Sequence, residues 1–237
     1  MKIETLYPEI CDLYGDAMNV RYLSLALPDA EIISTPTKSA PAFIGGGVDL
    51  VYIGSMTESA QETAIAALSP HRDAIAARIA DGGAFLATGN AAELFLDCIE
   101  NEDNTRVPAL GIFDGYARRR RPARSNSLYL GKYGDIDIVG FNSRFCHMYS
   151  GAEPLFTTVR GLGRNPDTSD EGLRRNNFMA TYLLGPLLVL NPPFTRELLR
   201  VIGAEDARVP HEDAANRAYE IRLREFSDGA RGVVYSE

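Results

Sequence analysis

The sequence predicts an α/β protein built on a mostly parallel sheet. In the first half of the chain, short apolar runs typical of buried strands alternate with helical patterns, which favours parallel strands covered by helices on both faces. The 237 residues are 45% hydrophobic, which is enough for a sizeable core. No repeat, linker or low-complexity tract interrupts them, so we expect one continuous domain.

Four apolar runs mark the expected strands of the first half, at residues 3–6, 31–34, 50–53 and 84–87. Helical patterns follow at residues 20–27, 69–80 and 91–96. Ser69 is a plausible cap of the second helix, and Pro70 suits its first turn. Gly82 and Gly83 end it, because glycine accepts the left-handed conformation that closes helices.

The second half reads differently, with a predicted strand pair around the Gly134–Asp135 turn at residues 127–133 and 136–141. Two more strands are expected at 155–159 and 178–183, and two helices at 193–202 and 212–226. We therefore expect the main domain to span residues 1–205. Residues 206–237 should add a C-terminal helix packed on the same domain.

Composition excludes several classes of function. The formal net charge is −8, from 24 Lys and Arg against 32 Asp and Glu, which argues against nonspecific nucleic-acid binding. No stretch approaches the roughly 20 apolar residues of a membrane span, and the start lacks the apolar core of a signal peptide. Three scattered cysteines predict a reducing, cytoplasmic setting, and no cluster has the spacing of a zinc site.

One local pattern points to chemistry. The segment from Phe85 to Ala91 runs from a strand through a glycine turn into a helix. Such a sharp turn lifts one side chain above the sheet and aims backbone N–H groups at developing negative charge. Its apex holds Thr88, Gly89 and Asn90, none of which is a primed nucleophile. From these residues alone, an ordinary strand–helix turn is the alternative.

Longer segments carry a resemblance to a known family. They are LYPEICDLYGDAMNV (6–20), VPALGIFDGY (107–116), DIVGFNSR (137–144) and PLFTTVRGLGRNPDTSDEGLRRNNFMATYLLGPLLVLNPPF (154–194). On these motifs the chain resembles the class I glutamine amidotransferase-like proteins of the cobyric acid synthase type. Within that family it is most similar to the GatD-like glutaminase subunits of lipid II isoglutaminyl synthase.

The resemblance implies a flavodoxin-like, three-layer α/β/α fold. It also implies a partner, because GatD-like glutaminases work beside a MurT-like, Mur-ligase-like synthetase subunit. That subunit binds ATP and amidates the D-glutamate of the lipid II stem peptide during peptidoglycan synthesis. No cofactor is implied for the glutaminase chain itself.

The chain departs from the family at the positions that hydrolyse glutamine. Gly89 stands where family members carry the cysteine nucleophile, and Leu184 stands where they carry the histidine base. Their glycine-triplet oxyanion loop keeps only Gly54 and continues with Ser55. The family motif G-F-E-N-H ends here in Arg144. A glycine cannot be acylated and a leucine cannot accept a proton, so the sequence predicts a noncatalytic pseudo-glutaminase.

Two alternatives stay open. The first is an active amidotransferase subunit that uses a relocated pair, Cys146 and His147, although adjacent strand residues point to opposite faces. The second is a stand-alone sensor that binds a small amino-acid-like ligand. Cys98 is expected to fill core space.

Candidate binding residues follow from the same comparison and from the strand ends. Ligands of open α/β folds gather where strands end, so we expect contributions from Gly54, Ser55, Thr88, Asn90, Asp16 and Asn19. Asp16 is equally consistent with a helix-start residue. Arg124 is a candidate because some family members use an arginine in this region for substrate, and Arg144 completes the set. The run from Arg118 to Arg121 is either a solvated loop or an anion contact.

Overall fold

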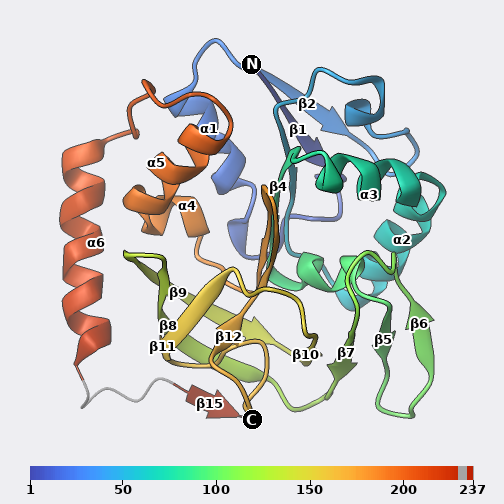
Figure 1. Ribbon diagram of the computed structural model, residues 1–237. Helices are drawn as coiled ribbons and strands as arrows, with labels where there is room; N and C mark the ends of the chain where they lie inside the picture. The colour runs from blue at the N-terminus through green and yellow to red at the C-terminus, as the bar shows by residue number, and fades with distance from the viewer. Residues whose placement is uncertain (229–233, 237) are drawn as a thin grey trace.

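A six-stranded sheet forms the centre of the computed structural model, which describes residues 1–228 and 234–236 (Figure 1). All neighbouring strands are parallel except the pair at one edge, β13 and β14. In spatial order the strands are β13 (Leu173–Arg175), β14 (Phe178–Thr181), β4 (Ala84–Thr88), β3 (Leu50–Ile53), β1 (Lys2–Leu6) and β2 (Glu31–Thr35). The predicted mostly parallel α/β fold is confirmed.

The central strands are buried on both faces. Tyr52 and Leu86 pack into one core, whereas Val51, Ile53 and Phe85 pack into the other. Successive strand residues point to opposite faces, so continuous apolar runs are what a sheet between two helical layers requires.

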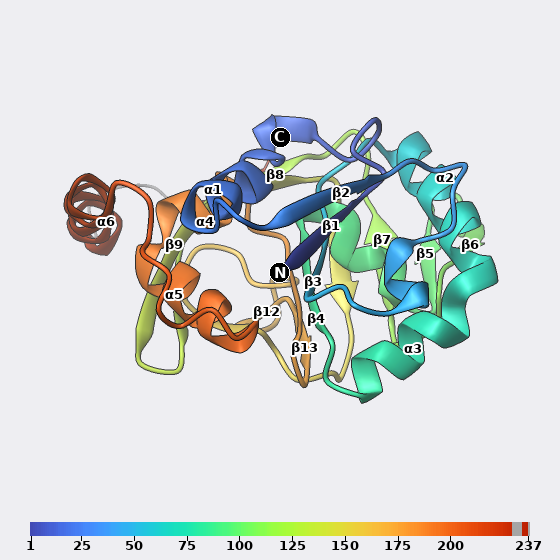
Figure 2. The same ribbon diagram turned by 90° about the horizontal axis from the view of Figure 1, so that it is seen from above.

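Helices cover the two faces of the sheet in separate layers (Figure 2). On one side lie α1 (Met18–Ala26), α4 (Leu187–Leu190) and α5 (Pro192–Val201). On the other lie α2 (Glu58–Leu68) and α3 (Arg72–Ala80). Short 3-10 turns occur at Leu13–Gly15, Ala42–Gly45, Ser69–His71 and Gly89–Phe95. This is the layered arrangement expected of the α/β class.

Mostly antiparallel strands extend the molecule beyond the carboxyl ends of the central strands, with β5 and β7 as a parallel pair (Figure 1). One small sheet contains β5 (Cys98–Glu100), β6 (Arg106–Pro108), β7 (Tyr116–Arg119) and β10 (Cys146–Tyr149). The predicted hairpin around Gly134 forms β8 (Ser125–Tyr133) and β9 (Ile136–Arg144), joined by β11 (Phe156–Arg160), β12 (Asp170–Glu171) and β15 (Val234–Ser236).

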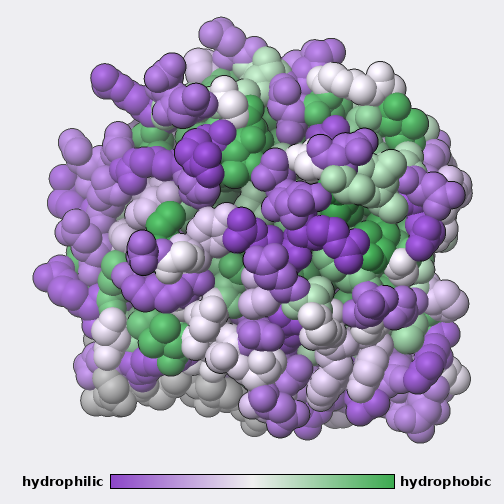
Figure 3. All heavy atoms as spheres, viewed as in Figure 1, coloured by the Kyte–Doolittle hydropathy of each residue, from purple (hydrophilic) through white to green (hydrophobic). Residues whose placement is uncertain are grey.

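The helix α6 (Glu212–Ser227) lies at one side of the molecule, against α4, α5, β8 and β9. Tyr219 is its buried residue, and the Tyr219 hydroxyl donates a hydrogen bond of 2.8 Å to the Asp137 carbonyl oxygen. Its outer side is mainly hydrophilic at the left of Figure 3. Residues 229–233 and 237 of the expected C-terminal segment lie outside the described residues.

Several sequence expectations need correction. Ser69 does not cap the helix that follows it. The Ser69 hydroxyl donates to the Ile65 carbonyl oxygen at 2.7 Å, so Ser69 ends α2, which the sequence reading missed. The predicted helix at 91–96 is a 3-10 turn over Gly89–Phe95. No helix in the described part of the chain is long and apolar enough to cross a membrane.

Candidate functional site

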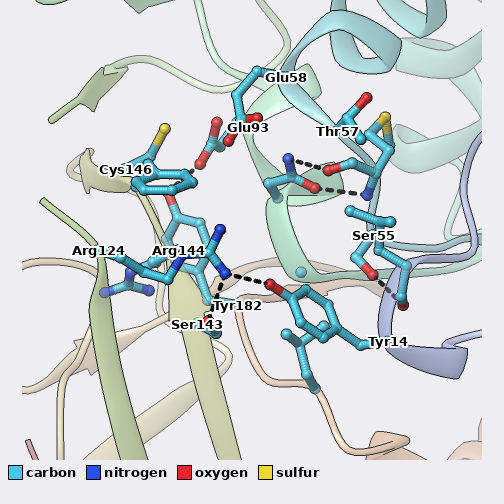
Figure 4. Close-up of a pocket in the computed structure, with 16 residues that line it drawn as sticks. Tyr14, Ser55, Thr57, Glu58, Glu93, Arg124, Ser143, Arg144, Cys146 and Tyr182 are labelled. Atoms are coloured by element: carbon cyan, nitrogen blue, oxygen red, sulfur yellow. Dashed lines mark hydrogen bonds between the residues drawn. The ribbon is translucent and has the colours of Figure 1, made fainter. Parts of the chain in front are cut away.

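A small cavity of about 140 Å³ lies beyond the carboxyl ends of β3 and β4, facing the end of β9 (Figure 4). Figure 4 places Arg124 and Arg144 on one side and Ser55 and Thr57 on the other. The lining residues are Leu13, Tyr14, Ser55, Met56, Thr57, Glu58, Gly89, Asn90, Glu93, Arg124, Ser143, Arg144, Phe145, Cys146, Tyr182 and Leu184. Gly89 and Leu184, which stand where the resembling family carries its cysteine and histidine, therefore line the same cavity.

Gly89 adopts a left-handed backbone conformation with φ +63°, as a sharp strand–helix turn requires. A Cβ placed on Gly89 would lie 2.5 Å from Ser55 Cβ and 3.1 Å from Leu184 Cδ2. A side chain at position 89 would thus point at residue 184, the arrangement that a nucleophile and its base need. Ser55 and Leu184 occupy that space.

The backbone N–H groups of the neighbouring loop are already bonded within the chain. Ser55 N donates to Asp16 Oδ2 at 2.9 Å, and Met56 N donates to Asn90 Oδ1 at 3.0 Å. Asn90 Nδ2 returns a bond of 2.8 Å to the Met56 carbonyl oxygen. An oxyanion needs unengaged donors aimed at it, so this loop offers neither of these two N–H groups to a substrate.

Asp16 anchors a buried network behind the cavity. Thr88 Oγ1 donates to Asp16 Oδ2 at 2.6 Å, and Asn19 Nδ2 donates to Asp16 Oδ1 at 3.1 Å. Burial raises the pKa of the Asp16 carboxyl, which the bonds from Thr88 and Ser55 oppose. All three of these residues are buried, and none lines the cavity. Their hydrogen bonds link the segment that follows β1 to the end of β4.

Gly54 also lies behind the cavity wall. A Cβ on Gly54 would lie 2.5 Å from the Cys11 carbonyl oxygen, so the chain crossing at this point needs a glycine. Its role is to let two loops approach each other, and it is not among the lining residues.

Arg124 lies at the cavity with its guanidinium held by two hydroxyl groups. Arg124 Nη1 donates to the Tyr14 hydroxyl at 2.9 Å and to Ser143 Oγ at 3.4 Å. The guanidinium carbon also lies 4.3 Å from the centre of the Phe145 ring. Hydroxyls orient a guanidinium but do not neutralise it, and the described residues include no carboxylate in an ion pair with Arg124.

Arg144 is almost fully buried, with 5% of its surface exposed. Its guanidinium carbon stacks 3.8 Å from the centre of the Tyr182 ring, and Nη2 donates to the Gly163 carbonyl oxygen. Nε and Nη1 have no hydrogen-bond partner among the described residues. Burial lowers the pKa of Arg144, although neighbouring Tyr182, Glu171 and Glu93 oppose that change.

Cys146 and Glu93 share the inner wall of the cavity, close to Tyr182. The Glu93 carboxylate accepts bonds from Gln61 Nε2 at 2.7 Å and from the Tyr182 hydroxyl at 3.0 Å. Burial raises the pKa of Glu93, and bonds from Gln61 and Tyr182 oppose this. Burial and then the charge of Glu93 raise the pKa of the Cys146 thiol well above its ordinary value. A thiol in this setting stays protonated at neutral pH.

His147 does not face the cavity. Its imidazole lies between Arg120 Nη1 and Ser125 Oγ, each 3.3 Å away. Burial, followed by the charges of Arg144 and Arg120, lowers the pKa of His147 to about 4. Cys146 and His147 therefore alternate across β10, as expected for adjacent strand residues.

The basic run is not a solvated loop, because β7 includes Arg118 and Arg119. Arg119 is buried and donates to Glu62 Oε1 at 3.1 Å, to Asn101 Oδ1 at 2.9 Å and to Gln61 Oε1 at 3.1 Å. Arg118 pairs with Glu100 and Arg121 with Glu102. These three arginines are thus bonded within the chain.

The structure brings together most of the predicted site and adds residues that the sequence reading missed. Ser55, Gly89, Asn90, Arg124, Arg144, Cys146 and Leu184 all line the cavity. The missed lining residues include Glu93, Ser143 and Tyr182. Tyr182 lies two residues before Leu184, and Ser143 lies beside Arg144. Their closeness in sequence to predicted site residues is the feature that could have identified them. No group of three metal-ligating side chains occurs within residues 1–228 and 234–236.

Comparisons with known proteins give one sequence relative and several structures of similar fold. No family model matches the chain. The chain is 26% identical over 151 residues to the GatD subunit of the glutamine-hydrolysing lipid II isoglutaminyl synthase of Staphylococcus aureus strain N315. The match covers 64% of this chain and 62% of that relative, which is less than two thirds of its length.

Solved structures show the same fold. A chain of PurLQS from Thermotoga maritima matches with a TM-score of 0.54 and 11% identity, covering 94% of this chain and 98% of that one. A glutamine amidotransferase from Thermotoga maritima matches with a TM-score of 0.50 and 10% identity, covering 95% and 91%. The architecture is therefore the fold of these two structures, one of which is a glutamine amidotransferase. In sequence, the chain is similar to a GatD subunit.

Proposed function

We propose that this GatD homologue is a noncatalytic, pseudo-glutaminase member of its family. The single observation that carries the proposal is the filled space in front of Gly89, where a Cβ would meet Ser55 at 2.5 Å and Leu184 at 3.1 Å. Position 89 has no side chain to attack an amide, and position 184 has none to accept a proton. Without both groups there is no covalent route from glutamine to ammonia.

The loop donors support the same conclusion. Ser55 N and Met56 N are bonded to Asp16 and Asn90, so an oxyanion near Gly89 would have to displace a carboxylate or an amide oxygen. Removing a single oxyanion donor in other hydrolases costs about 10²–10³ in rate. A substitution that restores only the nucleophile should therefore leave the reaction slow.

The relocated pair is less well supported. Cys146 lines the cavity, but its thiol has a raised pKa and lies beside the Glu93 carboxyl. His147 lies outside the cavity wall and bonds Arg120 and Ser125 instead. A nucleophilic thiol needs a lowered pKa or a base free to take its proton. The pKa of Cys146 is raised, and the neighbouring Glu93 carboxylate already accepts bonds from Gln61 and Tyr182.

An electrophilic glutamine analogue tests this proposal. A glutamine mimic with a diazoketone in place of the amide alkylates a reactive active-site thiolate, which intact-protein mass spectrometry detects. We expect no adduct on this chain under conditions that label an active glutaminase completely. An adduct mapped to Cys146 would instead favour the relocated site.

A synthetase partner is the second part of the proposal. The relative from Staphylococcus aureus is named as a subunit of a synthase. On this chain, large apolar side chains are exposed in residues 13–18, of which Leu13 and Tyr14 line the cavity. Leu13 is 37% exposed, and Tyr14 and Met18 are each 48% exposed. We expect co-purification with a MurT-like, Mur-ligase-like protein from the native host. Repeated failure to associate at micromolar concentrations would favour the stand-alone, ligand-binding alternative.

A further inference from the structure

Arg144 carries a buried charge that the described residues do not pair. Its Nε and Nη1 lack hydrogen-bond partners, and Nη2 bonds only the Gly163 carbonyl oxygen. Buried charges in proteins are normally paired and hydrogen-bonded, because an unpaired one loses its hydration without compensation. Arg144 lines the cavity, so a ligand in the cavity is a natural source of the missing partner.

The nearby carboxylates do not fill that role. Glu171 accepts bonds from Thr181 Oγ1 at 2.7 Å and from Tyr182 N at 2.8 Å. Glu93 accepts its bonds from Gln61 and the Tyr182 hydroxyl. Both carboxylates act to raise the pKa of Arg144 from a distance. Within the described residues, neither forms an ion pair with Arg144.

Arg124 is the second guanidinium of the same cavity. The Tyr14 and Ser143 hydroxyls hold it in place without neutralising it. Two guanidinium groups therefore line one cavity of about 140 Å³, smaller than the several hundred Å³ of typical drug-sized pockets. Glu58 and Glu93 line the cavity as well, but the Glu93 carboxylate already accepts bonds from Gln61 and Tyr182. The part of the cavity at the two guanidinium groups thus favours a small molecule with more than one negative group, because planar guanidinium groups match carboxylates well.

We propose that this cavity binds glutamate, or a dicarboxylate of similar length, in preference to the neutral amide glutamine. One carboxylate pairs with Arg124 and the other enters the inner wall to pair with Arg144. Glutamine offers only one carboxylate, so it leaves one guanidinium without a counter-charge. This inference rests on the proposed loss of hydrolysis, because an active glutaminase would have to select the amide.

Isothermal titration calorimetry tests the preference with L-glutamate, glutarate and L-glutamine as probes, in one buffer of low ionic strength. We expect L-glutamate to bind about tenfold or more tightly than L-glutamine, because a charged bidentate contact replaces a neutral one. Glutarate should share the preference, since it keeps both carboxylates. Binding of L-glutamine as tight as that of L-glutamate would overturn the inference.

Three variants locate the effect. Arg144→Met should lose the preference for L-glutamate while remaining folded, because replacing an unpaired buried charge by an apolar side chain is often neutral or stabilising. Arg144→Lys should keep part of the preference, since a point charge remains without the fork. Arg217→Gln, on the exposed surface of α6, is the matched control and should bind as the parent does.

The outcomes separate this inference from the function on which it rests. If neither L-glutamate nor glutarate releases or absorbs heat on titration, the inference is overturned. Arg144 would then be satisfied by water, which the unpartnered Asn142 Oδ1 could share. A preference that survives in Arg144→Met would overturn it as well. Neither of these binding results would show glutamine hydrolysis, so the proposed loss of hydrolysis would stand. Continuous heat with L-glutamine accompanied by glutamate release would instead contradict the proposed function.

Discussion

Ser55 fills the position that a side chain on residue 89 would need. A Cβ on Gly89 would come within 2.5 Å of Ser55 Cβ, and Ser55 is fixed by bonds from its backbone N–H to Asp16 and from its hydroxyl to the Leu13 carbonyl oxygen. Position 89 therefore has no side chain, and Ser55 closes the space that one would occupy. The turn has the left-handed backbone of a sharp strand–helix turn and no room for a side chain.

Gly89→Ala should destabilise the protein more than an alanine substitution at an uncrowded glycine. Gly134 is the matched control, because its φ of +55° is similar to the +63° of Gly89 and no atom lies within 4 Å of its added Cβ. We expect Gly134→Ala to cost roughly 1–2 kcal/mol from backbone strain alone. Gly89→Ala should cost about 1–3 kcal/mol more from the contacts with Ser55 and Leu184. Urea unfolding measures both, and equal losses would contradict the crowding.

Arg119 should matter for stability far more than its neighbour in the same basic run. Arg119→Met leaves the acceptors on Gln61, Glu62 and Asn101 without their donor, so we expect a loss of roughly 3 kcal/mol. Arg121→Met removes a half-exposed pair with Glu102 and should cost only about 0–1 kcal/mol. Thermal and urea unfolding of both variants check the difference. Similar small losses would restore the view of the run as a solvated surface.

His147 should make the protein sensitive to mild acid. Its pKa falls from 6.5 to about 4 in the folded state, chiefly through burial and then through Arg144 and Arg120. Between pH 6.5 and about 4 the unfolded chain therefore binds a proton at this site that the folded chain does not, so stability falls as pH falls. In His147→Gln this contribution should disappear, giving a flatter dependence of unfolding free energy on pH.

The raised pKa values of Asp16, Glu93 and Glu171 act in the opposite direction, because the folded state then holds the proton more tightly. These carboxyls are present in both proteins, so the difference between parent and His147→Gln isolates the histidine. Parallel pH profiles for the two proteins would show that His147 titrates normally.

Cys146 should resist alkylation in the folded protein. It is 3% exposed and its pKa is raised by burial and by Glu93, whereas Cys98 is partly exposed. Because thiolates are the reactive form, we expect iodoacetamide at pH 8 to modify Cys98 first and Cys146 only after unfolding. Peptide mass spectrometry reports the order. Modification of Cys146 as fast as that of Cys98 would indicate an activated thiol.

The central layers were predictable because their signal is local. Apolar runs such as 50–53 and 84–87 can be buried on both faces only in a parallel sheet, and they form β3 and β4. The helix α2 was missed although Thr57 caps it, accepting a bond from Ala60 N at 3.2 Å. The strands around Arg118 and Cys146 were missed because their pairing partners lie far along the chain.

The meeting of Gly89 and Leu184 was predictable, whereas the contacts around them were less so. Motif spacing placed Gly89 and Leu184, and the structure brings them into one cavity. Sequence could not show that Asn90 bonds the Met56 backbone or that Arg144 is buried against Tyr182. Those contacts arise from the packing of β9 and β14 against the loops after β3 and β4, which no single segment specifies.

Glutamine hydrolysis by the purified chain tests the central claim most directly. Glutamate release is followed at saturating glutamine, with the chain alone and with any Mur-ligase-like partner that co-purifies, beside an enzyme-free blank and an active glutaminase. The account predicts a rate equal to the blank in both conditions, because neither Gly89 nor Leu184 can take part in acyl transfer. A rate clearly above the blank that survives repeated purification would contradict it.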